Sequence, residues 1–456
     1  MKQFEGIETI FFLGIGGIGM SALARYFART SMRVCGYDRT PSPLTRELES
    51  EGIAITYDDD PSVISRSPFA LSPANTLVVR TPAVPEDSAI YTYLREQGFS
   101  IRKRAEMLGE ITRTKKALCV AGTHGKTTTS TMLAHLMRSN AFLGGISVNY
   151  GTNVLIVPES DYVVVEADEY DRSFHHLTPY ISVITAVDAD HLDIYGTPEA
   201  YREAFAHYTS LITGALVMKH GIELQPRLQP GVPCYTYGIE EGDFYADNIR
   251  VHNGQIRFDF HTPTDTLTDV ELGVPVWVNI ENAVAAMAVA WLVAKESPRA
   301  DDQLSMKAAM ASFRGVQRRF NRHVNTERVV YIDDYAHHPQ EIATAIESVR
   351  KVYPDRRLIG VFQPHLYTRT RDFADAFTRV LSTLDELILL PIYPAREKPI
   401  PGVTSEMLGG RVVEKADLVA ELKRRVAQSK QPVVVMTIGA GDIDRLVPEI
   451  TKAFNE

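Results

Sequence analysis

The sequence predicts an α/β protein of three consecutive domains. Its 456 residues are too many for one hydrophobic core and favour about three. Short apolar runs alternate with segments of helical periodicity, which is the pattern of parallel sheets covered by helices. Glycine-rich loops twice join an apolar run to a helical segment, at 14–21 and 122–128. We expect a Rossmann-like domain over 1–105, a central P-loop ATPase-type domain with a mostly parallel sheet over 106–322, and a C-terminal Rossmann-like α/β domain over 323–456.

The composition indicates a soluble, cytoplasmic protein that acts on small molecules. The net charge of −9 argues against a nucleic-acid binder, since phosphate contacts require clustered Lys and Arg. The scattered cysteines, Cys35, Cys119 and Cys234, have no metal-binding spacing and indicate a reducing compartment. No apolar run reaches the roughly 20 residues needed to span a bilayer, and the first residues lack a signal-peptide pattern. We therefore expect neither a nucleic-acid nor a membrane partner.

The first glycine loop, Gly14–Ser21, fits GxGxxG at a junction between an apolar run and a helix. Asp38 ends the next apolar run about 20 positions on, where a carboxylate accepts a ribose hydroxyl. Alone, this pattern favours a nicotinamide dehydrogenase, but the same geometry binds any diphosphate at a helix N-terminus. Further along, Arg102 and Arg104 either meet phosphate or belong to a solvated basic run.

The second glycine loop carries the most specific pattern in the chain. The apolar run 117–121 ends in GTHGKTT, and a helical pattern follows. Backbone N–H groups of such a loop surround phosphate oxygens, Lys126 adds a positive charge, and Thr127 offers a hydroxyl to Mg²⁺. The structural alternative is a glycine turn with a capping threonine. The general P-loop has glycine where this chain has Val120, so the motif is a shortened form, and its expected ligand is a nucleoside triphosphate.

Acidic residues follow the apolar runs downstream of the P-loop. Glu166 ends one run, where α/β nucleotide enzymes place a metal carboxylate, and is the expected Mg²⁺ ligand. Asp168 and Glu169 fit the pattern of exposed loop acids. His191 follows the next run and is either a metal ligand beside phosphates or a hydrogen-bonding loop residue.

Two asparagines begin an alanine-rich helical segment. Asn279 and Asn282 are three positions apart, so both amides lie on one face of its first turn. There they either contact an adenine edge or cap a core helix. Spacing alone leaves both interpretations open.

Nine motifs, in order and over nearly the whole chain, resemble the Mur ligase family of bacterial cell-wall synthesis. They are FFLGIGGIGMSALA, AGTHGKTTT, VVEADE, DADHLD, NIENAVAA, FRGVQRRF, DDYAHHP, FQPHLYTRTRD and GAGDI. The loop GIGGIGMS is most similar to that of the member that adds L-alanine to UDP-N-acetylmuramate. The resemblance implies ligation through an acyl phosphate, with ATP and Mg²⁺ as cofactors, in peptidoglycan synthesis. A related murein-peptide ligase and a nicotinamide dehydrogenase are the alternatives.

The resemblance also implies roles for individual residues, and the first glycine loop then holds a UDP diphosphate in place of a nicotinamide cofactor. The residues implied to bind substrates are Gly14, Gly16, Gly17, Ile18, Gly19, Ser21, Asp38, Thr81 and Arg371. Those implied to bind ATP are Gly122, Thr123, His124, Gly125, Lys126, Thr127, Thr128, Asn279, Asn282 and Arg318. Those implied to hold metal are Thr127, Glu166 and His191. The implied catalytic residues are Lys126, His191, Asp334, His337 and Arg369.

The C-terminal motifs imply the groups that receive the amino acid. His337 is the candidate general base for its amine, with Asp334 as the residue that orients it. Many relatives carry arginine where this chain has Leu366. The carboxylate of alanine is therefore expected to meet Arg369 or Arg371.

Two further observations concern the competing classes. Sister ligases for later amino acids carry a carbamylated lysine after the DHxD motif, whereas this chain has no lysine between His191 and Lys219. That difference fits the alanine-adding member. A P-loop switch or motor would explain Lys126 but not the first glycine loop. We expect a monomer or a weak homodimer.

Overall fold

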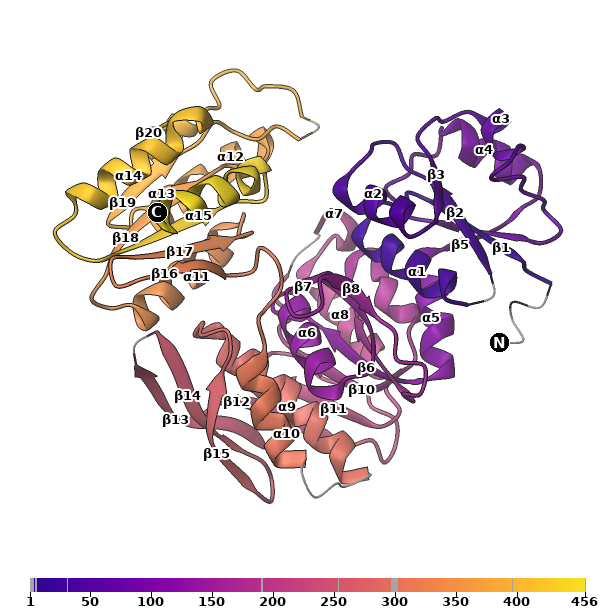
Figure 1. Ribbon diagram of the computed structural model, residues 1–456. Coiled ribbons are helices and arrows are strands. Elements are labelled where there is room, and N and C mark those ends of the chain that lie inside the picture. Colours follow the sequence, from indigo (N-terminus) through magenta and orange to yellow (C-terminus); the bar gives the residue numbers. More distant parts are fainter. Residues whose placement is uncertain are drawn as a thin grey trace. The chain divides into compact units, whose positions relative to one another are not determined.

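The computed structural model describes residues 4, 6–30, 32–189, 192–252, 254–296, 302–395 and 397–455. Within these ranges the strands form three sheets, of five, ten and six strands (Figure 1). The expected three-domain α/β architecture is confirmed, whereas the boundaries near residues 105 and 322 stay a prediction. The chain divides into two compact units, which are described separately. The first comprises Met1–Ala246, Phe260–Leu267 and Asn282–Ala309, and the second Asp247–Asp259, Thr268–Glu281 and Met310–Glu456.

The first sheet is parallel in every pair, with strand order β3-β2-β1-β4-β5. Its strands are β1 (Thr9–Leu13), β2 (Arg33–Tyr37), β3 (Ala54–Thr56), β4 (Thr76–Arg80) and β5 (Ser100–Lys103). Its helices are α1 (Ile18–Ala28), α2 (Pro43–Ser50), α3 (Pro61–Ile64) and α4 (Ala89–Glu96). From β1 the chain first adds β2 and β3 on one side of the sheet and then returns to add β4 and β5 on the other, so the order of the strands reverses between β1 and β4. In an open parallel sheet this reversal point, at the carboxyl ends of the strands, is where ligands bind.

The second sheet has the order β15-β14-β13-β12-β11-β10-β6-β9-β7-β8 and is mixed, because β8 runs antiparallel to β7. Its first strands are β6 (Lys116–Ala121), β7 (Asn140–Ser147), β8 (Thr152–Leu155), β9 (Tyr162–Glu166) and β10 (Pro179–Ile184). The others are β11 (Ala215–Lys219), β12 (Cys234–Ile239), β13 (Phe244–His252), β14 (Gln255–His261) and β15 (Thr266–Leu272). The helices between them are α5 (Arg104–Thr114), α6 (Lys126–Met137), the 3-10 segment η2 (Tyr170–His176), α7 (Leu192–Tyr195), α8 (Pro198–Thr209), α9 (Val278–Glu296) and α10 (Asp302–Ser312).

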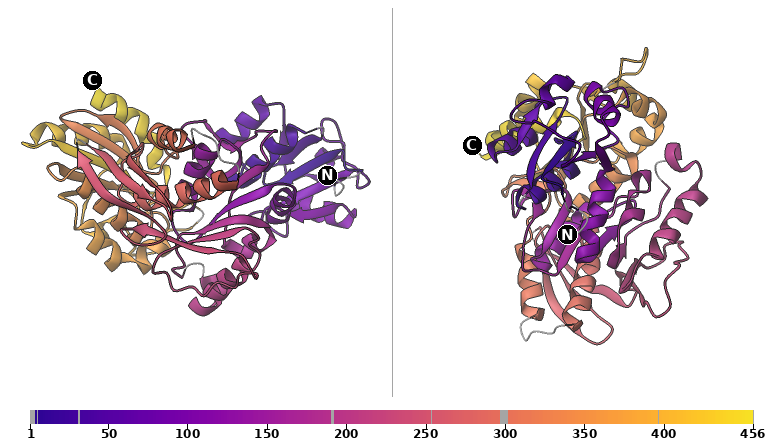
Figure 2. Two further views of the ribbon diagram at one scale, coloured as in Figure 1. Left: turned by 90° about the horizontal axis from the view of Figure 1, so that it is seen from below. Right: turned by 90° about the vertical axis from the view of Figure 1, so that its right-hand side faces the viewer.

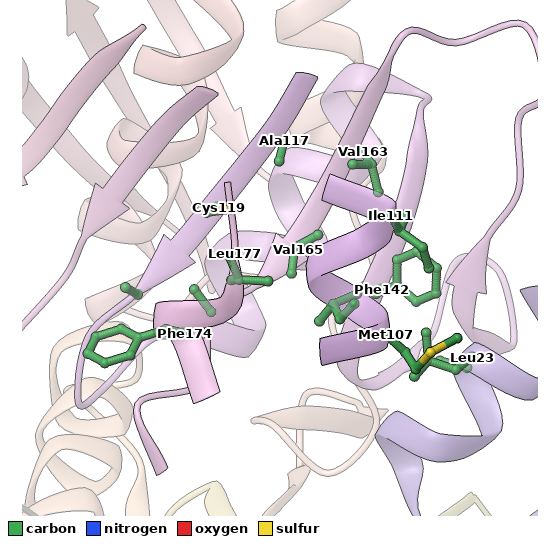
Figure 3. Packing of buried hydrophobic residues seen from close by; sticks show 14 of the residues in the cluster. Leu23, Met107, Ile111, Ala117, Cys119, Phe142, Val163, Val165, Phe174 and Leu177 are labelled. Carbon is green, nitrogen blue, oxygen red and sulfur yellow. The ribbon is translucent and has the colours of Figure 1, made fainter. Parts of the chain in front are cut away.

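The core of the first unit explains why its strands are apolar without alternation. On β6, Ala117 and Cys119 belong to the main hydrophobic cluster, and the intervening Leu118 and Val120 are also fully buried. A parallel strand covered on both faces buries residues of both parities. Figure 3 shows part of this cluster, with Met107 of α5 next to Leu23 of α1.

Helix α9 is long and apolar enough to cross a membrane by length and composition, but 67% of its apolar window is buried inside the protein. Its small side chains let it pack closely on its neighbours, and the residues of its central part are almost all buried. It is therefore a core helix.

The second unit contains a six-stranded sheet of order β16-β17-β21-β18-β19-β20, in which β16 is antiparallel to β17 and the other pairs are parallel. Its strands are β16 (Asn321–Asn325), β17 (Val329–Asp334), β18 (Arg357–Phe362), β19 (Glu386–Leu389), β20 (Arg411–Val412) and β21 (Val433–Ile438). Its helices are α11 (Pro339–Val352), α12 (Tyr367–Asp372), α13 (Ala374–Leu381), α14 (Leu418–Gln428) and α15 (Val447–Asn455). Short 3-10 segments are η3 (Ser405–Leu408), η4 (Lys415–Asp417) and η5 (Asp442–Leu446). Figure 2 shows this C-terminal part of the chain, in orange to yellow, from two further sides.

The two faces of this sheet bury alternate residues. Val433 and Val435 of β21 join a cluster with Leu422 of α14 and Ile450 of α15. The intervening Val434 is fully buried outside that cluster. Strand residues of opposite parity face opposite sides. Helices thus cover both faces, as in the expected Rossmann-like domain.

Replacing Phe174 by alanine should destabilise the first unit. Its ring is fully buried, stacks on Tyr208 at 4.7 Å and meets Phe205 edge-on at 5.1 Å. We expect a loss of about 3–5 kcal/mol, from lost burial and the cavity left behind. Urea unfolding followed by circular dichroism would measure it. Leu304→Ala, at a side chain that is 72% exposed, is the control and should change stability by at most about 0.5 kcal/mol.

Candidate active site

The first glycine loop lies at the carboxyl ends of β1, β2 and β4, where the sequence placed it. Gly14 has φ +83°, and a Cβ there would come within 2.5 Å of the Thr81 side chain. The Gly16 N–H donates to Asp38 Oδ2 at 2.7 Å. The structure therefore brings Gly14, Gly16, Asp38 and Thr81 together. In this arrangement Asp38 fixes the loop itself.

The loop presents the N-terminus of α1. Gly17 caps the helix, and Ile18 and Gly19 form its first turn, where N–H groups have no partner within a helix and favour an anion. A Cβ on Gly19 would meet Arg104 Nη1 at 2.8 Å, so the guanidinium lies against this turn. Arg104 also lies 3.6 Å from Asp168 Oδ2, with 23% of its side chain exposed. Of the basic run, Arg104 is thus part of the loop's surroundings, whereas Arg102 pairs with Glu110 at 3.2 Å.

Ser21 supports this turn from inside the protein. Its hydroxyl is fully buried and donates to the Ile18 carbonyl at 2.9 Å, and its own N–H donates to Gly17. Asn153 of β8 is also fully buried and donates to the same Ile18 carbonyl. Asn153 accepts in turn from Arg25 at 3.2 Å. A side chain of the second sheet therefore holds the diphosphate-type loop of the first.

The predicted strand, glycine loop and helix are β6, residues 122–125 and α6. Gly122 has φ +131°, and a Cβ there would lie 2.2 Å from Thr185 Oγ1, so only glycine fits. Thr123 donates its N–H to Ala186 O at 3.0 Å and its hydroxyl to Asp188 O at 2.7 Å. The Thr185 hydroxyl donates to the His124 carbonyl. The loop is thereby fixed against the end of β10, and Thr128 follows in the first turn of α6.

The amino group of Lys126 folds back onto its own loop. It donates to Gly122 O at 2.6 Å and to Thr123 O at 3.3 Å, and both oxygens of Glu169 lie 2.8 Å away. Glu169 is 1% exposed, and burial raises the pKa of its carboxyl. The expectation that Glu169 is an exposed loop acid is wrong. No spacing rule points to it, because the loop after β9 is irregular.

A hydroxyl and a carboxylate meet beside the loop. The Thr127 hydroxyl donates to Glu166 Oε1 at 3.1 Å, and the Gly144 N–H donates to Glu166 Oε2 at 3.0 Å. A Cβ on Gly144 would come within 2.3 Å of that carboxylate, so glycine makes room for it. Oxygen donors of this kind suit Mg²⁺. Thr127 and Glu166 therefore fit the expected metal.

The third residue expected to hold the metal, besides Thr127 and Glu166, is His191, which lies outside the described residues. Among the described residues, no group of three or more His, Cys, Asp or Glu side chains could hold a metal ion. A Mg²⁺ at Thr127 and Glu166 would therefore take its other ligands from phosphate and water, as Mg²⁺ at nucleotide sites commonly does.

The two asparagines of α9 have different surroundings. Asn282 Oδ1 accepts from Thr129 at 3.1 Å, and a Cβ on Gly125 would lie 2.8 Å from the same oxygen. Asn282 is thus in contact with the P-loop. Asn279 donates to Val274 O at 3.3 Å within the second unit. Both are only 6% exposed.

In the second unit, Asp334 and Arg318 join the carboxyl ends of two strands. Asp334 ends β17 and accepts the N–H groups of Phe320 and Ala336, both at 2.7 Å. Burial raises the pKa of its carboxyl. Arg318, at φ +60°, donates to the Gly439 carbonyl in the loop after β21. Both side chains therefore bind backbone groups of the loops at the carboxyl ends of these strands.

The carboxylate beside His337 is Glu341 and not Asp334. His337 Nδ1 lies 3.4 Å from Glu341 Oε2 and 3.2 Å from Tyr335 O. Glu341 also accepts the His337 N–H at 3.0 Å. Burial lowers the pKa of His337, and Glu341 opposes that lowering. A signal for Glu341 existed, because a glutamate in the first turn of a helix often accepts the N–H groups that precede the helix.

A second histidine and one of the two candidate arginines lie with His337. The rings of His337 and His365 are 6.3 Å apart, and Arg369 Nη1 is 3.4 Å from His365 Nδ1. Arg371 instead donates to its neighbour Asp372 at 2.7 Å, with 52% of its side chain exposed. The geometry thus favours Arg369 over Arg371 for an incoming carboxylate. His365 was not among the predicted site residues, although it lies in the same motif.

A P-loop lysine, a hydroxyl and carboxylate suited to Mg²⁺, and a diphosphate-type loop in the same unit define a nucleotide-dependent α/β enzyme. Three family models match the chain. These are the Mur ligase family catalytic domain over residues 9–116, the Mur ligase middle domain over 120–290 and the Mur ligase glutamate ligase domain over 318–441. The chain belongs to the Mur ligase family.

Individual relatives cover the full length. The UDP-N-acetylmuramate–L-alanine ligase of Phocaeicola vulgatus is 55% identical over 99% of both chains. That of Parabacteroides distasonis is 55% identical over 97% of this chain and 96% of its own. The crystal structure of UDP-N-acetylmuramate-alanine ligase from Thermotoga maritima superposes with a TM-score of 0.78 at 26% identity, covering 98% of this chain and 99% of that one.

Gly144→Ala should raise the Mg²⁺ concentration needed for ATP turnover. The added methyl would displace the Glu166 carboxylate, which a Cβ would approach to 2.3 Å. We expect at least a roughly tenfold increase in half-saturating Mg²⁺, in the range seen when a group that orients a metal ligand is lost. A Mg²⁺ titration at fixed ATP measures it. Gly98→Ala, at a positive φ but with open space around its Cβ, controls for general strain, and equal titrations for both variants would contradict the assignment.

Proposed function

We propose that this protein joins L-alanine to UDP-N-acetylmuramate at the expense of ATP. The products are UDP-N-acetylmuramoyl-L-alanine, ADP and phosphate, and the reaction is a cytoplasmic step of peptidoglycan precursor synthesis. The observation that carries the proposal is the P-loop Lys126, next in sequence to Thr127, which is hydrogen-bonded to Glu166, in the same unit as the first glycine loop. The 55% identity to relatives named for this reaction supports it.

In the first chemical step the carboxylate of the sugar substrate attacks the γ-phosphorus of ATP, and ADP leaves. Lys126 neutralises charge on the transferring phosphoryl group. Thr127 and Glu166, with His191 as a further proposed ligand, would hold a Mg²⁺ ion, which when bound would supply additional positive charge beside the phosphates. The first turn of α1, with Gly19, binds the diphosphate of the sugar nucleotide. The product of the step is an acyl phosphate.

In the second step the amine of alanine attacks the acyl carbonyl, and phosphate leaves. The amine reacts as a free base, so His337 accepts a proton from it, with Glu341 holding the ring. Burial keeps His337 neutral to lower pH than an ordinary histidine. Arg369 binds the carboxylate of alanine.

The remaining proposed roles concern the nucleotide and the assembly. Asn279 and Asn282 are proposed to bind the adenine, and Arg318 is a further proposed ATP-binding residue. Thr81 and Asp38 line the sugar-nucleotide site. The buried packing of α9, the helix with the composition of a membrane span, supports a soluble location. We propose a monomer or weak homodimer.

Phosphate release with UDP-N-acetylmuramate, ATP and a panel of alanine, serine and glycine tests the function. We expect release to require the nucleotide sugar and to be fastest with alanine. Lys126→Ala should lower the rate by at least about a hundredfold, as loss of a charge-stabilising group does, while circular dichroism stays unchanged. Release without any amino acid would favour a P-loop switch, and reduction of a nicotinamide cofactor would favour a dehydrogenase.

The pH dependence of kcat at saturating substrates tests His337 as the base. Because burial lowers its pKa, the acid limb should fall below the ordinary histidine value of about 6.5. Glu341 raises this pKa, so Glu341→Gln should move the limb to still lower pH. Glu347→Gln, on the same helix and paired with Lys351 at 2.8 Å, should leave the limb in place. A limb that moves upward in Glu341→Gln would remove His337 from this role.

A further inference from the structure

The P-loop lysine has no N–H left for a phosphate. A lysine ammonium carries three donors. In Lys126 these face Gly122 O at 2.6 Å, Thr123 O at 3.3 Å and the Glu169 carboxylate at 2.8 Å. Binding of a triphosphate to Nζ therefore requires at least one of these contacts to break.

The carboxylate is the contact that competes with phosphate. The two carbonyls belong to the loop that surrounds the phosphates, and Gly122 and Thr123 are fixed against residues 185–188. Glu169 presents a negative charge to Nζ, as a phosphate would. An incoming phosphate can therefore replace the Glu169 carboxylate as the partner of Lys126 Nζ.

Glu169 is held firmly where it is. The Tyr195 hydroxyl donates to its backbone carbonyl, which also accepts the Arg172 N–H at 2.9 Å. Tyr201 places its hydroxyl 3.5 Å from Glu169 Oε1 and 3.0 Å from Thr123 Oγ1. The side chain is 1% exposed, so water cannot solvate the carboxylate in place of Lys126. The flexible lysine is thus the partner that moves.

We propose that Glu169 is the counter-ion of the P-loop lysine, which holds its amino group against the loop in the nucleotide-free site and competes with the phosphates of ATP. This inference rests on the proposed nucleotide site. Glu169 therefore lowers nucleotide affinity while positioning the lysine. Removing a residue with a merely structural role would weaken nucleotide binding, whereas removing a competing counter-ion strengthens it.

Calorimetric titration of the full chain with a non-hydrolysable ATP analogue and Mg²⁺ tests the inference. Glu169→Gln, which keeps the shape and removes the charge, should bind the analogue about tenfold tighter, equivalent to about 1.4 kcal/mol. Asp171→Asn is the matched control. It removes one negative charge from the same loop, is paired with Lys103 at 3.5 Å, and has φ +51°, which asparagine tolerates. Its affinity should stay within about twofold of the unchanged chain.

The outcomes separate the two proposals. If the unchanged chain does not bind the analogue, the proposed function fails. If it binds and Glu169→Gln binds equally or more weakly, or Asp171→Asn gains as much affinity, the counter-ion inference fails alone. Should Glu169→Gln not fold, Glu169→Asp retains the charge but withdraws it by one methylene. It should bind the analogue more tightly than the unchanged chain, and equal or weaker binding would overturn the inference.

Discussion

The parallel pairing of β6 with β9 is the constraint on which the proposed chemistry depends. Its register places Val120 opposite Glu166, one residue before β6 ends at Ala121. The P-loop begins directly after that point, so Thr127 and the Glu166 carboxylate come within 3.1 Å. Carboxyl ends of parallel strands meet at one edge of a sheet, so this proximity follows from topology.

Residues 166–169, at the end of β9 and directly after it, include three carboxylates, and each carboxylate contacts a different side chain. Glu166 accepts from Thr127, Asp168 lies 3.6 Å from Arg104, and Glu169 holds Lys126. Arg104 lies in turn against Gly19 in the diphosphate-type turn. One short loop thus contacts a residue proposed to hold the metal, the P-loop lysine proposed to meet the phosphates, and an arginine beside the turn proposed to bind the sugar nucleotide. Nucleotide binding that draws Lys126 from Glu169 acts on the same loop that positions Arg104.

Much of the fold and site was predictable, because strand, glycine loop and helix signals are local. The GTHGKTT loop and the pairing of Thr127 with Glu166 needed only spacing and strand-end geometry. Glu169 and Glu341 were missed for a different reason. Their roles come from the course of the backbone after a strand or before a helix, and sequence spacing alone does not determine which side chain a loop carboxylate meets. Asp334 was assigned to His337 although its oxygens accept backbone N–H groups.

Glu169 in the first unit and Glu341 in the second share one property. Hydrogen bonds with neighbouring groups hold each of these two residues in place. Glu341 accepts the N–H groups of His337 and His338 at 3.0 and 3.3 Å, so its position is set by the start of α11. Glu169 is fixed through its backbone carbonyl, which accepts from the Tyr195 hydroxyl and the Arg172 N–H. Lys126, which must change partners, and Arg369, which is proposed to bind the carboxylate of alanine, are long flexible cations. When one of these cations exchanges one anionic partner for another, only its own side chain has to change rotamer. The carboxylates of Glu169 and Glu341 can then stay in place.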